Sequence, residues 1–279
     1  MQTSNSKEVL TIRDLGVRYG GARAVDGVSL SVHKGEVVGI VGESGSGKST
    51  ILNAVAGLLP RTAEVCSGSI SCGGIDVLRE SEKKKRALLG KAIGYLFQNA
   101  EGSFDPLFTI GSQFDEALRS NGFARKHRRE RLGIMGEALK HVGLDDADRV
   151  LKALPSELSG GMCQRAALAI ALAQNPAILL ADEPTNALDV RTQEKVVGIL
   201  KRLNHEDGLS ILMVSHDIDL VASFAHRIVV MHDGRVVESG PSGKLMADPQ
   251  HSYTRELIAA IPRASDEIEV TELGGRHAS

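Results

Sequence analysis

Residues 42–50 have the sequence Gly42-Glu43-Ser44-Gly45-Ser46-Gly47-Lys48-Ser49-Thr50. This stretch matches the phosphate-loop pattern G-x-x-x-x-G-K-[ST] without a mismatch. Residues 36–41, just before it, are apolar and rich in β-branched side chains, which predicts a short buried strand. Residues 51–58, just after it, predict the first turns of a helix. Because glycine adopts backbone conformations that other residues avoid, the loop between strand and helix can wrap around a phosphate group.

The order strand, glycine loop and helix predicts a site for a nucleotide phosphate. The backbone N–H groups of residues 45–50 can point inward, and the helix N-terminus adds partial positive charge. In loops of this pattern the lysine, here Lys48, reaches the β- and γ-phosphates, and the hydroxyl group of Ser49 ligates Mg²⁺. The alternative is a glycine-rich turn that happens to precede a helix, but the strand, lysine and serine in register favour the nucleotide.

Composition narrows the class of protein. The chain has 279 residues, enough for one large α/β domain or two lobes of one domain, and its 42% hydrophobic and 24% charged residues are ordinary for a globular protein. Its formal net charge of −2 argues against a nucleic-acid partner. The 3 cysteines, a polar N-terminus and the lack of an apolar run of about 20 residues predict a protein of the cytosol without a membrane span. Any membrane association is then expected to come from docking onto another protein.

Two further predicted strands end in residues with chemical potential. Residues 178–181 form an apolar run that ends at Asp182 and Glu183. A carboxylate at this position of a phosphate-loop protein holds Mg²⁺, which fits Asp182, and Glu183 could polarise a water molecule near the γ-phosphate. Residues 210–215 form another such run, which ends at His216. Because parallel strands present their carboxyl ends at one sheet edge, these groups are expected to meet there.

Other candidate residues have a structural as well as a functional interpretation. Gln98 ends the predicted strand 92–97 and is either a polar terminus or a neighbour of the metal-bound nucleotide. Tyr19 either stacks on an adenine ring or packs in the core. Ser159, followed by Gly160 and Gly161, either only caps the helix after it or also helps to bind an anion. The basic run 125–131 has no aromatic residues among its charges, so we expect a solvated helix face rather than a nucleic-acid contact.

The patterns along the chain predict three structural regions. Residues 9–32 alternate polar and apolar side chains, which predicts antiparallel strands, and residues 66–78 continue this β structure. Helical periodicity dominates residues 99–175, which we interpret as an inserted helical lobe. A final hairpin is expected over 228–240, and the polar stretch 265–279 is expected to be a frayed tail.

Taken together, these motifs resemble the ATPase subunit of an ABC (ATP-binding cassette) transporter. The resemblance extends from about Val9 to Gly240, and Leu158-Ser159-Gly160-Gly161 is similar to the signature sequence of this family. It implies a P-loop NTPase core with an antiparallel β-subdomain and the helical subdomain at 99–175, within one ATPase domain at 1–264.

The resemblance also implies a mechanism. Two such subunits pack head to tail, and each ATP lies between the phosphate loop of one subunit and Ser159-Gly160-Gly161 of the other. It assigns adenine stacking to Tyr19, a bridge between Mg²⁺ and the membrane partner to Gln98, and the general base to Glu183. It further implies that His216 contacts the γ-phosphate and that Asp189 couples the two sites. ATP and Mg²⁺ are therefore the expected ligands.

Some segments are similar to a particular subfamily, the importers of oligopeptides, dipeptides, nickel or metal chelates. These segments are 99–113, 162–165 and 251–257, although Ser252 replaces the proline that is more usual in the last one. The expected partners are two integral membrane permeases, a second ATPase that is identical or related, and an extracytoplasmic solute-binding protein. The subunit would then be peripheral, at the cytoplasmic face of the inner membrane.

Two features leave the biological role open. Because no cysteine follows Cys163, the iron–sulfur cluster segment of many peptide-importer ATPases is expected to be absent, which leans toward the nickel or metallophore type. An alternative from another class is a non-transport ATPase in a soluble assembly, such as a phosphonate-degrading lyase complex.

Overall fold

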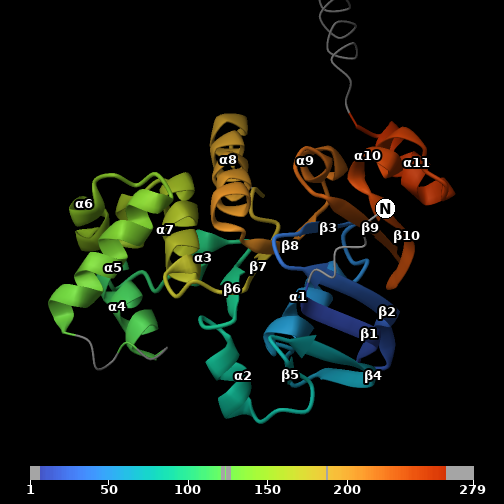
Figure 1. The fold of residues 1–279 in the computed structure, drawn as a ribbon, viewed down its shortest axis with the longest axis horizontal. Coiled ribbons are helices and arrows are strands. Elements are labelled where there is room, and N and C mark those ends of the chain that lie inside the picture. The colour runs from blue at the N-terminus through green and yellow to red at the C-terminus, as the bar shows by residue number, and fades with distance from the viewer. Residues whose placement is uncertain (1–6, 121–122, 124–126, 187, 262–279) are drawn as a thin grey trace, which may run out of the picture.

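The fold is described from a computed structural model, which covers residues 7–120, 123, 127–186 and 188–261. Figure 1 shows two sheets on one side of the molecule and a group of helices, α3 to α7, on the other. The predicted tail, residues 265–279, and part of the basic run, residues 125 and 126, lie outside the described residues.

The larger sheet carries the carboxyl edge on which the predicted site depends. Its order is β10-β9-β3-β8-β7-β6, and all neighbouring strands are parallel except β10, which is antiparallel to β9. The strands span β3 Val37–Val41, β6 Ile93–Leu96, β7 Ile178–Asp182, β8 Ser210–Ser215, β9 Arg227–His232 and β10 Arg235–Pro241. Every residue of β3, β7 and β8 is buried, as continuous apolar runs predict for parallel strands covered on both faces.

The smaller sheet is antiparallel and has the order β2-β1-β4-β5. Its strands are β1 Glu8–Tyr19, β2 Ala22–His33, β4 Ala63–Cys72 and β5 Ile75–Asp76, as the alternating patterns predict. Helix α1, Lys48–Ala56, follows β3, and its buried residues share one hydrophobic core with both sheets. This packing fixes the direction of α1, and with it the position of the phosphate loop.

The helices of the predicted lobe are α3 Ala100–Ser103, α4 Ile110–Ser120, α5 Arg128–His141, α6 Ala147–Lys152 and α7 Gly160–Leu172. Phe114, Leu118 and Leu139 are buried in a hydrophobic core separate from the one around α1. This second core also includes residues of β7 and α8. The expected solvated face holds for residues 127–130 of the basic run, which are exposed, but it is wrong for Arg131. Arg131 is 8% exposed, and its Nε lies 2.5 Å from Asp115 Oδ1. The acidic partner on α4 lies 16 residues away, and the basic run gave no sign of it.

The remaining helices flank the sheets. They are α2 Glu82–Leu88, α8 Val190–Asp207, α9 Ile218–Ala222, α10 Ser242–Ala247 and α11 Ser252–Ala259. Figure 1 shows α10 and α11 beside β9 and β10, at the edge opposite the helical lobe. None of the helices in the described part of the chain combines the length and the hydrophobicity needed to cross a bilayer.

Candidate functional site: a nucleotide site at the carboxyl edge of the sheet

The Lys48 side chain lies across the phosphate loop. Its Nζ donates hydrogen bonds to the carbonyl oxygens of Gly42, at 2.8 Å, and Glu43, at 2.6 Å. The residue is only 5% exposed, and this burial lowers the pKa of Lys48, while the charges of Glu183 and Asp182 oppose that shift. A cation held among carbonyls inside a glycine loop is well suited to bind a phosphate anion.

The Ser49 hydroxyl and the Asp182 carboxylate are adjacent. Ser49 Oγ donates a hydrogen bond of 2.9 Å to Asp182 Oδ1, and burial raises the pKa of Asp182 above its ordinary value. Hydroxyl and carboxylate oxygens suit a hard cation such as Mg²⁺. Within the described ranges, no group of three His, Cys, Asp or Glu side chains could hold a metal ion, so a cation here needs further oxygen ligands, which a nucleotide phosphate supplies.

Glu183 has two polar neighbours at the same sheet edge. Its Oε2 accepts a hydrogen bond from Gln98 Nε2 at 3.2 Å and lies 3.2 Å from His216 Nδ1. The Glu183 side chain is 16% exposed, whereas that of His216 is 60% exposed, so the carboxylate lies below a more open imidazole. Both residues line a small cavity of about 160 Å³.

The backbone of Glu183 has an uncommon conformation. Its φ is +44°, in the left-handed region that non-glycine residues seldom adopt, and its N–H donates to the Val214 carbonyl at 2.9 Å. Such outliers cluster at functional sites, where the surrounding structure holds them. The bond to β8 therefore sets the direction in which the Glu183 side chain leaves β7.

Tyr19 lies at the end of β1, next to the start of α1. Its hydroxyl is 3.5 Å from Thr50 Oγ1, and the partly buried ring packs against the core between the two sheets. The packing interpretation therefore has support, and the position near the loop keeps the adenine-stacking prediction open.

Ser159 and Asp189 each cap a helix. Ser159 Oγ accepts from Met162 N at 3.3 Å at the start of α7, where Ser159 and Gly160 are exposed. Asp189 accepts from Thr192 Oγ1 at 2.6 Å and from Thr192 N at 3.1 Å at the start of α8, and the side-chain bond is the main reason why the pKa of Asp189 is lowered. The described contacts tie these two residues to α7 and α8 rather than to the phosphate loop of their own chain.

Comparison with protein families shows the family of the chain. A family model described as "ABC transporter" matches residues 25–186, which include the phosphate loop, Ser159 and Glu183. The chain belongs to the ABC transporter family. The family confirms the predicted α/β fold class. It also confirms the predicted enzyme class, an ATPase that binds and hydrolyses nucleotide.

Individual relatives extend the likeness. The chain is 39% identical over 272 residues to "Dipeptide transport ATP-binding protein DppD" of Escherichia coli (strain K12), covering 96% of this chain and 83% of the relative. It is 43% identical over 269 residues to "Peptidoglycan transport ATP-binding protein YejF" of Agrobacterium fabrum, of which it spans 49%. A solved structure, the dimeric post-hydrolysis state of the ATP-binding cassette MJ0796 bound to ADP and Pi, matches with a TM-score of 0.74, 33% identity and coverage of 84% of this chain and 98% of that chain.

Sequence reasoning gave three residues no role around the nucleotide site of this ABC ATPase, although two of them lie in the importer-like segments 162–165 and 251–257. Gln164, 4% exposed on α7, donates to the Pro184 carbonyl at 2.8 Å and so ties the helical lobe to the residue after Glu183. Tyr95 donates to Asn53 Oδ1 at 3.1 Å, beside α1. The Tyr253 hydroxyl accepts a hydrogen bond from Glu43 N at 2.9 Å. The polar Gln164 in an otherwise apolar helix could have predicted a buried hydrogen bond. The sequence around Tyr95 and Tyr253 contains no pattern that predicts their contacts.

A larger cavity than the one beside Glu183 lies elsewhere. A cavity of about 1180 Å³ lies between α5 and the N-terminal strand and is lined by Val9, Ile134 and Leu209 among others. It contains none of the residues that face the phosphate loop. The candidate nucleotide site is therefore located by its polar and charged side chains and not by the size of its cavity.

Proposed function

We propose that this chain is the ATP-hydrolysing subunit of an ABC importer that energises uptake of peptides through a membrane permease. The observation that carries the proposal is the arrangement of Glu183, Gln98 and His216 at the same sheet edge as the phosphate loop. Relatives named as dipeptide and peptide transport proteins support peptides as the cargo. These relatives favour the importer over the soluble assembly, and nickel or a metal chelate is the cargo to test against peptides.

Each site residue has a proposed role that follows from its chemistry. Glu183 is the general base, because its carboxylate is partly shielded and is oriented by Gln98 and His216. His216 contacts the γ-phosphate from its open position. The N–H groups of the loop and Lys48 bind the phosphates, and Tyr19 stacks on the adenine ring. The phosphate-binding group as a whole comprises Gly42, Glu43, Ser44, Gly45, Ser46, Gly47, Lys48, Ser49 and Thr50.

A magnesium ion fits the oxygen atoms at this edge. We propose Ser49, Asp182 and Gln98 as the side chains that hold it, because a hydroxyl, a carboxylate and an amide carbonyl all offer hard oxygen ligands. When bound, the ion neutralises charge on the β- and γ-phosphates. The raised pKa of Asp182 reflects a buried carboxylate, and a cation at this position would favour its charged form.

The second half of the ATP site is proposed to come from another ATPase subunit. Ser159 and Gly160 are exposed at the start of α7, so their helix N-terminus is free to face a γ-phosphate bound by a partner, and the related cassette MJ0796 is described as dimeric. Asp189 at the start of α8 would couple the two sites. We propose that 99–175 form the helical subdomain within an ATPase domain at 1–264, and that the partner is an identical or related subunit.

Three exposed apolar side chains that lie close to Gln98 along the chain support docking to the permease. Leu107 is 82% exposed, Phe108 55% and Phe97 45%. The Phe97 ring is also stacked on Tyr95, with centroids 4.4 Å apart. Exposed apolar groups of this size mark protein interaction sites. We place the subunit at the cytoplasmic face of the inner membrane, with two permeases and an extracytoplasmic binding protein as its partners.

Copurification from the native cells in mild detergent tests this proposal. We expect the tagged chain to carry two integral membrane proteins and a second ATPase, and the complex to hydrolyse ATP faster when peptide-loaded binding protein is added. Leu107→Asp should lose the permeases, whereas Leu132→Asp, at a 38% exposed leucine on α5, should retain them. Recovery of soluble enzymes without any membrane protein would sink the importer assignment, and stimulation by nickel complexes but not by peptides would correct the cargo.

A further inference from the structure

The C-terminal part of the chain contacts the phosphate loop. Glu43 N–H donates a 2.9 Å hydrogen bond to the Tyr253 hydroxyl, which belongs to α11. The two residues are 210 positions apart, and the family match ends at residue 186, well before α11. The contact therefore involves a residue outside the region that the family model matches.

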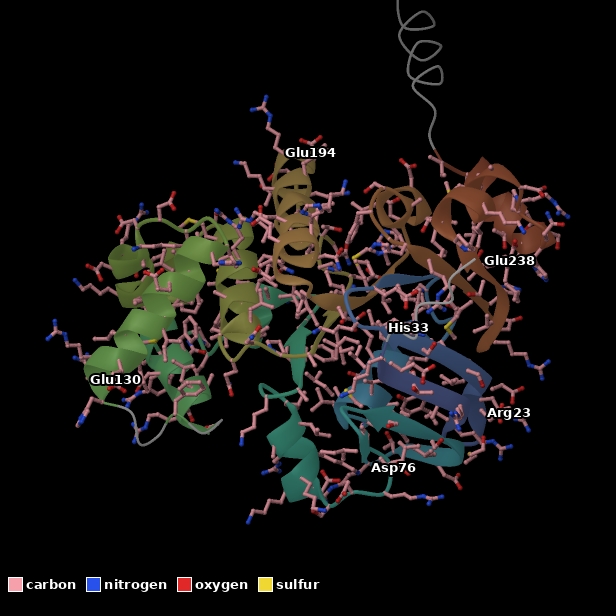
Figure 2. The ribbon with its side chains drawn as sticks, viewed as in Figure 1. Arg23, His33, Asp76, Glu130, Glu194 and Glu238 are labelled. Atoms are coloured by element: carbon pink, nitrogen blue, oxygen red, sulfur yellow. The ribbon has the colours of Figure 1, made fainter. Side chains whose placement is uncertain are left out.

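Tyr253 is firmly held where it touches the loop. It is 6% exposed, and its ring lies against that of His232 at the end of β9, with centroids 4.1 Å apart. The segment that leads into α11 is attached to β10, because the Glu238 carboxylate accepts hydrogen bonds from Gln250 N at 2.9 Å and His251 N at 3.0 Å. Figure 2 shows Glu238 on the side of the molecule that carries α10 and α11.

Tyr253 and Lys48 hold opposite ends of one peptide group. The carbonyl of the peptide between Gly42 and Glu43 accepts from Lys48 Nζ at 2.8 Å, and its N–H donates to the Tyr253 hydroxyl. Gly42 itself leaves no room for a side chain between the loop and β9. Its φ is +152°, and a Cβ at this position would lie 2.2 Å from the Met231 carbonyl oxygen. The first peptide of the loop is thus fixed from three directions.

We propose that Tyr253 is a positioning residue for ATP binding, which acts by orienting the Gly42–Glu43 peptide and, through it, the Lys48 ammonium group. The inference rests on the proposed role of the phosphate loop. Without the hydroxyl, the nucleotide-free loop can turn this N–H toward water. To bind phosphate, the loop must then turn the Gly42–Glu43 peptide back, which leaves the Glu43 N–H without a hydrogen-bond partner. The variant therefore loses free energy of ATP binding.

The test compares Mg-ATP affinity and turnover of the full-length wild type, Tyr253→Phe, Lys48→Ala and Glu256→Gln. Tyr253→Phe keeps the ring on His232 and removes only the hydroxyl, and Glu256 is an exposed residue of the same helix that serves as the matched control. We expect Tyr253→Phe to raise the Kd for Mg-ATP about 2- to 12-fold, the range for the net loss of one hydrogen bond at a partly buried position. Its kcat at saturating ATP should stay within about twofold of wild type, since Glu183 and His216 are untouched.

The outcomes separate the inference from the proposed function. Unchanged affinity in Tyr253→Phe together with weakened binding in Lys48→Ala overturns the positioning role and leaves the nucleotide site intact. Unchanged affinity in Lys48→Ala overturns the site assignment itself. A fall in thermal stability of Tyr253→Phe without a change in Kd would show that the tyrosine only supports the fold, and this also rejects the inference.

Hydrogen exchange provides a second readout that needs no variant. In the wild-type chain without nucleotide, the Glu43 amide should be protected from exchange, because the hydroxyl of a buried tyrosine accepts its hydrogen. Exchange of Glu43 as fast as that of the exposed residues Ser44 and Gly45 would contradict the contact.

Discussion

His216 Nδ1 lies 3.2 Å from Glu183 Oε2, although the two residues are 33 positions apart in the chain. They meet because β7 and β8 are neighbouring parallel strands, so the residues that follow them emerge at the same edge. Gln98 and His216 both contact Oε2 of Glu183, and the left-handed backbone of Glu183 directs the side chain toward that edge. This relationship carries the catalytic proposal.

Replacing Glu183 with glutamine removes the proposed general base and keeps the shape of the side chain. We expect ATP hydrolysis to slow by about 10² to 10⁴-fold, the usual scale for loss of a general base, while ATP binding is retained. The ATP-bound dimer should then stay closed, which size-exclusion chromatography with and without ATP can detect. Phosphate release at an unchanged rate would contradict the role of Glu183.

Asp182→Asn should make the nucleotide-free protein more stable and less active. Burial raises the pKa of Asp182, so the folded state holds the proton more tightly than the unfolded state, and the charged form lowers stability at neutral pH. We expect the variant to gain about 0.5–2 kcal/mol in the free energy of unfolding at pH 7, the range typical of single stabilising changes. The gain should shrink as the pH is lowered, because Asp182 itself then becomes protonated. Denaturant unfolding at several pH values measures this, and a variant less stable than wild type at pH 7 would refute the argument.

Gly161 and Thr192 form a steric pair that joins the signature sequence to Asp189. A Cβ on Gly161 would lie 2.3 Å from Thr192 Cγ2, and the Thr192 hydroxyl is the group that binds Asp189. Gly161→Ala should therefore lower the free energy of unfolding by about 1–3 kcal/mol, the cost of overpacking a tight contact.

A second substitution tests whether that steric contact is the cause. Thr192→Ser removes Cγ2 and keeps the hydroxyl, so the double variant should regain most of the stability lost in Gly161→Ala. The double-mutant cycle then gives a coupling energy of about 0.5–3 kcal/mol. If the two substitutions change the free energy of unfolding additively, the contact with Thr192 is not the reason why residue 161 must be glycine.

The ion pair between Asp115 and Arg131 should stabilise the helical lobe in a pH-dependent way. The Arg131 guanidinium lowers the pKa of Asp115, so the pair contributes stability above the ordinary aspartate pKa, about 3.9, and loses it as the pH falls through the lower folded value. Asp115→Asn should be less stable than wild type at pH 5 to 8, and the difference should diminish below about pH 4. Glu137→Gln, in a mostly exposed pair with Lys140, should change stability far less. Equal unfolding curves for wild type and Asp115→Asn at pH 7 would count against the pair.

Local patterns predicted the strand, glycine loop and helix around Lys48 because each signal lies within a few residues of the others. The apolar runs before Asp182 and His216 predicted parallel strands for the same reason, and the ends of such strands share one edge. Arg131 shows where this reasoning stops. Its charge suggested solvent, yet its environment was decided by Asp115 on another helix.

By itself, the sequence determined that a phosphate loop, two carboxylates, a glutamine and a histidine would stand at the ends of strands in one α/β domain. These features depend on hydrophobic periodicity and on short motifs, which act over a few residues. Only the tertiary structure decided that Gln164 would tie the helical lobe to Pro184, and that Tyr253 would hold the loop from 210 residues away. Such contacts depend on how whole helices pack against the sheet edge, and buried hydrogen-bond partners are chosen by that packing rather than by neighbours in the chain.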